Sequence, residues 1–324
     1  MKRFLWRTGL AVSILALVLT LSLLASRSNP GMRDSLFAAM ADKDRMLDTT
    51  PSPRIILVGG SNLAYGIDSR RISRAFGLPV VNTGLNAGMG LYYIMERVRP
   101  YIRTGDIVVL SPEYSHFFGE QAEGDIALTT ALVMYPGDWR YLGPRQVVRQ
   151  LPYLAEYGAR SLSPDLKDLP AKLGLVRRAE SGAVPGINTR RAYDGYGDHT
   201  AHLGLAPREI EFPVCLLQYD RPNPRVMAAV EELAHDLEVR GARLVVVPQV
   251  FQRQAYERLR HQVDEVADGL ARRGCGALFE PERYALADSL FFDTVSHTDS
   301  AGRRVRTTRL IEDLARVLPA GRVD

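Results

Sequence analysis

Short apolar runs that end at a glycine or a polar turn, each followed by a helical pattern, limit this chain to a fold built on a parallel β-sheet. These runs fall at residues 54–59, 78–84, 106–111, 242–248 and 277–279. They are rich in Val, Ile and Leu, which is typical of strands buried on both faces. Helical patterns are expected between and after them, at residues 69–76, 87–102, 223–240, 254–273 and 300–318. The alternation predicts an α/β fold with a central parallel sheet.

The alternation stops between about residues 112 and 212, a region that holds many Pro, Gly, Tyr and Arg residues. It is too long for a simple loop in a compact domain, so a partly helical insertion is expected there. Residues 28–52 are polar and read as a helical lead-in. The predicted organisation is therefore an N-terminal segment 1–27, the lead-in 28–52, and an α/β domain over 53–324 that carries the insertion.

The N-terminal segment has the features of a membrane signal. Lys2, Arg3 and Arg7 precede an uncharged apolar run at residues 8–25, whose length is at the lower edge of what spans a bilayer as a helix. Positive charge before the run predicts a cytoplasmic N-terminus. A cleaved signal peptide and an uncleaved signal anchor both fit, and the length of the run and its poor cleavage site favour the anchor. Either way, the remainder is expected outside the cytoplasm, as the periplasmic domain of a single-pass inner-membrane protein.

Composition narrows the classes of partner. The net charge is +4, and no basic block interleaved with aromatic residues occurs, so no nucleic-acid partner is expected. Cys215 and Cys275 are the only cysteines, and they either pair in an oxidising compartment or remain two buried thiols. No Cys/His spacing suits zinc, so neither a metal nor another cofactor is expected.

The first candidate for chemistry is Ser61, in the sequence Gly59-Gly60-Ser61-Asn62 directly after the first strand. A serine on a tight strand-to-helix turn exposes its hydroxyl, and its N–H points to where an oxyanion would form. The preceding glycines permit the sharp turn. An ordinary turn in which the serine caps the helix gives the same pattern.

Two further motifs follow later strands. Residues 82–88 read Asn-Thr-Gly-Leu-Asn-Ala-Gly, where the Gly84 N–H can serve an oxyanion hole and Asn86 can cap the next helix. Before the last helix stands Asp293-Thr-Val-Ser-His297. A histidine that deprotonates a serine needs a carboxylate to fix its tautomer, and one loop supplies both groups here. Taken singly, each motif is also typical of plain turns or of a surface histidine.

Taken together, the order of these motifs resembles the SGNH (GDSL-like) hydrolase and acyltransferase superfamily. The resemblance covers about residues 53–111 and 242–318 and leaves the insertion uncovered. It implies a three-layer, flavodoxin-like fold in which Ser61 is the nucleophile, His297 the base and Asp293 its orienting acid. The N–H groups of Ser61 and Gly84 would form the oxyanion hole.

Two departures from the family pattern stand out. Asp293 and His297 are separated by three residues, where the family usually has two. The usual Gly-x-Asn-Asp after the third strand is replaced by Ser-Pro-Glu113-Tyr114. Asn62 and Asn86 are therefore candidates for the missing oxyanion donor. In this respect the chain is similar to membrane-tethered SGNH-like proteins of alginate O-acetylation and teichoic-acid D-alanylation, which implies a membrane-bound O-acyltransferase as a partner.

Candidate substrate contacts come from two places. Glu113 and Tyr114 follow the third strand, and Glu113 also suits a structural salt bridge. In the insertion, Tyr196, Asp198 and His202 form a polar cluster that suits a polysaccharide or a solvated loop. The expected function is serine-dependent acyl transfer, with acetyl as the expected group, to or from a cell-envelope or exopolysaccharide. The alternative is a non-catalytic binding or assembly subunit of an exopolysaccharide machine.

Overall fold

A four-stranded parallel sheet forms the centre of the computed structural model, which confirms the α/β prediction. The structure describes residues 1, 3, 4, 6–10, 13, 17, 20, 30–162, 186–210, 212 and 214–318. The strands lie in the order β2-β1-β3-β4. Their bounds are Ile55–Gly59 for β1, Val80–Asn82 for β2, Ile107–Ser111 for β3 and Arg243–Val246 for β4. β1 pairs with β2 on one side and with β3 on the other. The chain runs from β1 to β2 in one direction and from β3 to β4 in the other, so the connections diverge at the carboxyl ends of β1 and β3.

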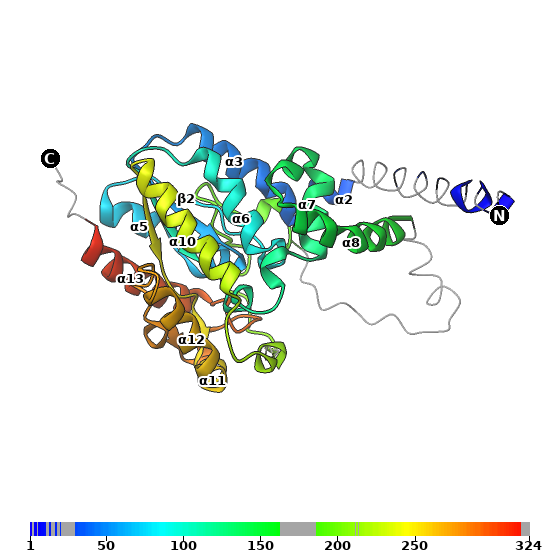
Figure 1. Ribbon diagram of the computed structural model, residues 1–324. Helices are drawn as coiled ribbons and strands as arrows, with labels where there is room; N and C mark the ends of the chain where they lie inside the picture. The colour runs from blue at the N-terminus through cyan, green and yellow to red at the C-terminus, as the bar shows by residue number, and fades with distance from the viewer. Residues whose placement is uncertain are drawn as a thin grey trace.

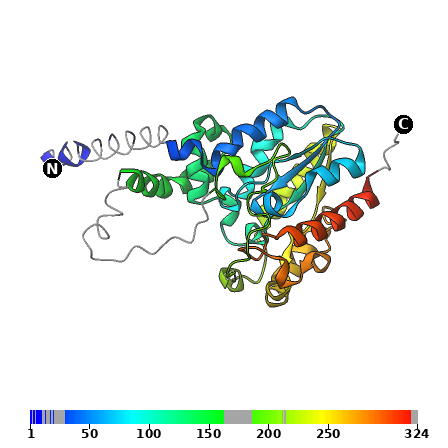
Figure 2. The same cartoon turned by 180° about the vertical axis from the view of Figure 1, so that it is seen from behind.

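Helices cover both faces of this sheet, as Figures 1 and 2 show. Side chains alternate along β1: Ile55 and Leu57 join one apolar cluster, and Ile56 and Val58 join the other. The first cluster includes residues of α5 and α13, and the second includes residues of α3, α6 and α10. The bounds are Ala39–Thr49 for α3, Ser61–Gly66 for α4, Ser69–Phe76 for α5, Leu91–Val98 for α6, Pro224–Val239 for α10, Arg253–Arg258 for α11, Arg260–Ala271 for α12 and Ser300–Val317 for α13.

Three sequence predictions were wrong in detail. The single helix expected at 254–273 is divided at Leu259 into α11 and α12. The helix expected at 87–102 is broken, because Gly90 takes a φ of 78° between a 3-10 turn at Ala87–Met89 and α6. The strand expected at 277–279 does not form. Instead, β6 (Ala285–Leu286) pairs in parallel with β5 (Phe251–Gln252) as a separate two-stranded sheet.

The described part of the insertion contains two helices, α7 (Ile126–Met134) and α8 (Pro144–Leu162). The Asp125 side chain caps α7 by accepting from the Ala127 N–H at 2.8 Å. The Thr129 hydroxyl donates to Gln150 at 2.7 Å and joins the two helices. They lie at the end of the molecule away from the carboxyl end of α13 (Figure 1).

The lead-in helix α3 is fastened to the α/β core by Lys43. This side chain is 2 % exposed, and its Nζ donates to the Asn82 carbonyl at 2.8 Å and to the Gly197 carbonyl at 2.6 Å. Burial lowers the pKa of Lys43 to about 7. One side chain therefore joins the lead-in, the end of β2 and the insertion.

The predicted membrane segment, residues 8–25, lies largely outside the described residues. Within the part of the chain that the structure describes, none of the helices combines the length and the apolar character needed to cross a bilayer. Cys275 is a free thiol, and the Cys215 side chain lies outside the described part.

Candidate functional site

Ser61 is the first residue of α4, at the carboxyl end of β1, and it is half-buried. The two glycines before it are required by close packing. A Cβ on Gly59 would lie 2.5 Å from the Ser111 carbonyl oxygen, and a Cβ on Gly60 would collide with the Glu113 carboxylate. The strand therefore passes directly into the helix, and Ser61 lies beyond the sheet edge.

Asp293 and His297 form a hydrogen-bonded pair in the loop before α13. His297 Nδ1 lies 2.8 Å from Asp293 Oδ1, and the side chains are 13 % and 24 % exposed. Because a carboxylate only accepts, Nδ1 carries the proton, and the Nε2 lone pair is left to act as a base. The Thr294 hydroxyl oxygen accepts the His297 N–H at 3.0 Å, and this contact closes the loop. The unusual Asp-His spacing is therefore compatible with a paired geometry.

Tyr65 connects this loop to the helix that carries Ser61. Its ring stacks on the His297 ring with centroids 4.1 Å apart and planes 8° apart. Tyr65 follows Ser61 by four residues in α4, and residues at this spacing lie on the same helix face. Ser61 and His297 are thus brought to the same side of α4. Among the described residues, no direct hydrogen bond joins them.

Of the candidate oxyanion donors after β2, the Gly84 N–H is already engaged, because it donates to the Asn82 side-chain oxygen at 2.9 Å. The Asn86 side-chain oxygen accepts the Gly88 N–H at 2.8 Å and caps the following 3-10 turn. The Asn86 side-chain N–H groups make no hydrogen bond among the described residues. Gly84 also packs tightly on α4, because a Cβ there would lie 2.7 Å from the Gly60 carbonyl oxygen. These groups hold the turn and its approach to α4.

Asn62 points into the core rather than towards the sheet edge. It is fully buried, its amide donates to the Ser111 carbonyl at 2.9 Å, and its side-chain oxygen accepts from Arg306 at 2.6 Å. Arg306 also donates to the Asn62 carbonyl and, at 3.1 Å, to the Ser111 hydroxyl. Burial lowers the pKa of Arg306 to about 10. Arg306 on α13 therefore holds the first turn of α4 against β3.

Glu113 lies against the turn formed by Gly60 and Ser61. Its Oε1 accepts the Asn62 N–H at 3.1 Å, and its Oε2 lies 3.5 Å from His116 Nδ1. Both side chains are buried, and His116 Nε2–H donates to the Ala87 carbonyl at 2.8 Å. Sequence reasoning assigned no partner to His116, although the Glu-x-x-His spacing after β3 was the available signal. Glu113 supports the backbone around Ser61, as a structural residue does.

The remaining candidate substrate residues are held in internal contacts. Tyr114 is 1 % exposed and packs edge-on against Phe251. The Tyr196 carbonyl accepts the Asn82 N–H at 2.8 Å. Asp198 is fully buried and pairs with Arg303 at 2.8 Å. Burial raises the pKa of Asp198, against the hydrogen bonds of Ser69 and the charge of Arg303, which lower it. These contacts fasten the insertion to the sheet.

His202 belongs to a buried pair with His199. The two Nδ1 atoms are 2.9 Å apart, His199 Nε2 is 2.7 Å from the Ile187 carbonyl, and His202 Nε2 is 3.0 Å from the Thr298 carbonyl. Both rings are 1 % exposed. Burial lowers the pKa of His199 to about 4 and that of His202 to about 3. Sequence reasoning placed both histidines in the polar cluster of the insertion and did not connect them with His297.

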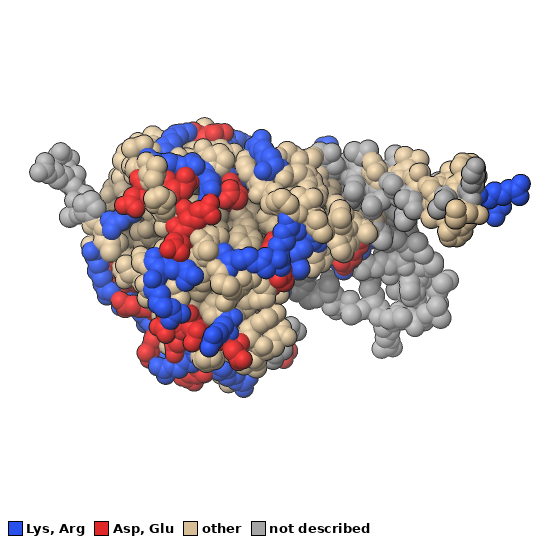
Figure 3. Space-filling model, viewed as in Figure 1, with Lys and Arg blue, Asp and Glu red and all other residues tan. Residues whose placement is uncertain are grey.

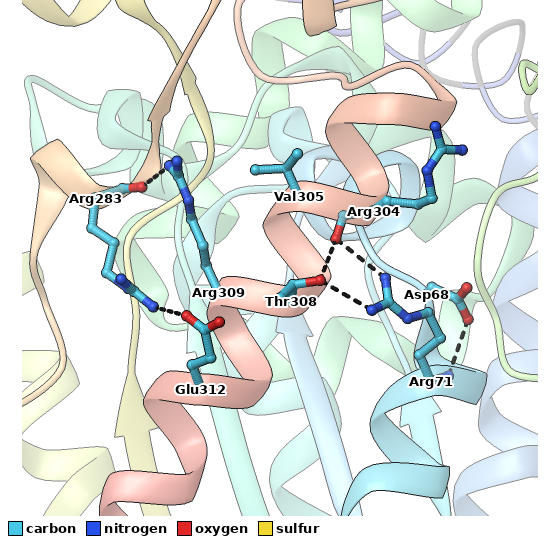
Figure 4. Close-up of a pocket in the computed structure, with 8 residues that line it drawn as sticks. All are labelled: Asp68, Arg71, Arg283, Arg304, Val305, Thr308, Arg309 and Glu312. Atoms are coloured by element: carbon cyan, nitrogen blue, oxygen red, sulfur yellow. Dashed lines mark hydrogen bonds and ion pairs between the residues drawn. The ribbon is translucent and has the colours of Figure 1, made fainter.

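A separate pocket of about 570 Å³ lies on the outer face of α13 (Figure 4). Arg71 reaches across from α5 and donates to the Arg304 carbonyl at 3.2 Å and to the Thr308 hydroxyl at 3.0 Å. Arg309 donates to the Arg283 carbonyl from the opposite side. The outer arginines of α13 thus line an open hollow, whereas Arg306 on the inner face is enclosed.

Comparison of the chain with protein-family models, curated proteins and solved structures finds no match. Among the described residues, no three His, Cys, Asp or Glu side chains gather as a metal site would require. On the face shown in Figure 3, acidic and basic side chains are interspersed. The candidate site therefore rests on its own geometry.

Proposed function

We propose that this chain is a membrane-anchored member of the SGNH superfamily, with the three-layer, flavodoxin-like fold, and that it transfers acyl groups through Ser61. The observation that carries the proposal is the Asp293–His297 pair, stacked on Tyr65 one turn after Ser61. The parallel order β2-β1-β3-β4, with the serine after β1 and the Asp-His loop before the last helix, supports the family assignment.

In the proposed reaction, His297 Nε2 takes the proton of the Ser61 hydroxyl as Oγ bonds to the carbonyl carbon of an ester. The leaving alcohol then takes that proton, and an acyl-serine remains. A sugar hydroxyl attacks the acyl carbon next and gives its proton to His297. The bond to Ser61 Oγ then breaks, Oγ takes that proton back from His297, and the acylated sugar leaves; in an esterase, water takes the place of the sugar. The acyl group is proposed to be acetyl and the acceptor a cell-envelope or exopolysaccharide.

Oxyanion stabilisation is the incomplete part of this site. The Ser61 N–H, at the start of α4, has no hydrogen-bond partner among the described residues and is the first donor. Gly84 becomes the second if Asn82 releases its N–H. Loss of one donor typically lowers kcat by about 10²–10³-fold. We therefore expect either a slow enzyme or a rearrangement at Asn82 when substrate binds.

The test is labelling of the purified full-length chain with a fluorophosphonate probe, with the adduct mapped by mass spectrometry. An adduct on Ser61 that is absent in His297→Ala is expected, because the neutral serine needs its base. His235→Ala, on the surface of α10, is the matched control and should label like the wild type. A folded wild-type chain that does not label at Ser61 would contradict the proposal.

A non-catalytic binding role is the second candidate, and the internal engagement of the Gly84 N–H favours it. In that case the chain would bind a polysaccharide as a subunit of an export or modification machine. Binding of polysaccharide by Ser61→Ala with wild-type affinity, together with no labelling of the wild type, is the result expected for this role.

The proposed location is the inner membrane, with residues 8–25 as the anchor and a membrane-bound O-acyltransferase as the partner. The basic residues that precede this run support the orientation. A topology reporter fused after residue 324 should report an extracytoplasmic position. A cytoplasmic signal would contradict both candidate functions.

A further inference from the structure

The Tyr65 ring is held on both faces by imidazoles. On one side it stacks on His297, and on the other on His199 with centroids 4.0 Å apart and planes 12° apart. Tyr65 is 5 % exposed, and burial raises the pKa of its phenol, so the ring remains neutral. A ring packed between two parallel neighbours has little freedom to tilt, and neither has the ring that rests on it.

The contacts continue from Tyr65 back to the base. His199 meets His202 through their Nδ1 atoms at 2.9 Å, and His202 Nε2–H donates to the Thr298 carbonyl at 3.0 Å. Thr298 directly follows His297. The chain of contacts therefore closes on itself: His297, Tyr65, His199, His202 and the backbone next to His297. A closed set of contacts fixes both the plane of the His297 ring and the position of its loop.

The insertion anchors the far side of this set. His199 Nε2–H donates to the Ile187 carbonyl at 2.7 Å, and the Tyr193 ring stands edge-on to His199 with centroids 5.2 Å apart. A carbonyl only accepts, so both Nε2 atoms of the His199–His202 pair carry protons, and these two bonds hold each ring in one orientation. While both rings are neutral, no hydrogen lies between the two Nδ1 atoms, and their contact becomes a hydrogen bond only when one ring takes up a second proton. The insertion thus reaches the candidate base through His199 and Tyr65.

We propose that Tyr65 is a positioning residue for His297, and that the His199–His202 pair holds the Tyr65 ring on the face opposite His297. This inference rests on the proposed function, since it assigns a base role to His297. Its basis is the placement of nucleophile and platform on one helix: α4 carries Ser61 at its start and Tyr65 one turn later. Any shift of α4 moves Ser61 and Tyr65 together, and the His297 ring that stacks on Tyr65 follows them.

The test compares Tyr65→Leu with Tyr65→Phe in the full-length chain. Tyr65→Phe retains the stacked ring and should label within about threefold of the wild type, whereas Tyr65→Leu should label at least about tenfold more slowly. Tyr256→Leu is the matched control. It removes another buried tyrosine, on α11, that is 3 % exposed and, among the described residues, makes no ring contact with Tyr65 or the three histidines around it.

A second readout does not depend on catalysis. A proton over the face of an aromatic ring is shifted upfield, so the ring protons of His297 should show this shift in the NMR spectrum of 13C-histidine-labelled protein. The signal is assigned by its loss in His297→Ala. The upfield shift of this signal should persist in Tyr65→Phe and be lost in Tyr65→Leu. Because this measurement needs no nucleophile, it tests the placement of His297 even if Ser61 proves inert.

Three outcomes would overturn the inference. One is an unchanged His297 signal in Tyr65→Leu, since the stacking would then not exist in solution. Another is wild-type labelling by Tyr65→Leu, since the stacking would then not matter for the reaction. The third is an equal loss of labelling in Tyr65→Leu and Tyr256→Leu, since general destabilisation would then explain both. Absence of Ser61 labelling in the wild type, with the expected NMR shift, would instead contradict only the proposed function.

Discussion

The loop at residues 293–297 and the turn at residues 82–86 both lie against α4, but they use their polar groups differently. In the loop, Asp293 and His297 pair with each other and leave the His297 Nε2 lone pair free. In the turn, the Gly84 N–H donates to the Asn82 side-chain oxygen, and the Asn86 side-chain oxygen caps a 3-10 turn. Under the proposed function, the groups for proton transfer are therefore already in place, whereas the Gly84 donor for the oxyanion is not. The comparison separates the two halves of the proposed serine mechanism.

The largest effect is expected from Asp293→Asn. The amide reverses the hydrogen bond to Nδ1 and selects the wrong tautomer of His297, which typically lowers the rate by about 10⁴-fold. The side chain is 24 % exposed, so the free energy of unfolding should hardly change. Labelling rate and urea unfolding measured on the same sample check both statements. A labelling loss below tenfold would mean that the loop is not prepared as the comparison requires.

Arg306→Met should have the next largest effect, on stability. It removes Arg306 as the donor to both oxygens of Asn62 and to the Ser111 hydroxyl, and leaves the Asn62 side-chain oxygen with the Ser111 hydroxyl alone. This change should lower the free energy of unfolding by about 3–5 kcal/mol. Arg304→Met, on the exposed face of the same helix, should stay within about 0.5 kcal/mol of the wild type. Equal unfolding midpoints in urea for the two variants would show that Arg306 does not support the α4 turn.

Lowering the pH should lower the free energy of unfolding through the His199–His202 pair. Burial holds their folded pKa values at about 4 and about 3, against 6.5 for a free ring. Below about pH 6.5 the two histidines are therefore protonated in the unfolded chain but still neutral in the folded one. The free energy of unfolding then decreases by about 1.4 kcal/mol for each neutral ring with every unit by which the pH is lowered. The loss continues until the folded rings protonate. Urea unfolding between pH 7 and pH 4 measures the slope, and His199→Phe/His202→Phe should flatten it.

The smallest effect is expected from Gly84→Ala. The added methyl would press on the Gly60 carbonyl and on α4, which should cost about 1–3 kcal/mol and slow labelling. Gly195→Ala is its control, because a Cβ there meets nothing within 4 Å. If Gly84→Ala destabilises the protein but labels at the wild-type rate, the turn supports the fold alone and takes no part in oxyanion binding.

The sequence predicted β1 to β4 and the closing helix because each has a long, regular apolar pattern. It failed at β6, where a two-residue strand carries no pattern, and its partner β5 lies 34 residues away in the register Phe251 to Ala285. The Asp293–His297 pair was predictable because both residues lie in one loop. The link from Tyr65 to His199 was not, because stacking across 134 residues leaves no mark in either local sequence.

Lys43 also makes the lead-in helix chemically traceable. Its amine is lowered in pKa to about 7, yet it is enclosed by the Asn82 and Gly197 carbonyls. An amine-reactive reagent at neutral pH can therefore acylate it only while α3 is detached from the sheet. Its acylation rate therefore measures how often α3 separates locally from the end of β2 at Asn82.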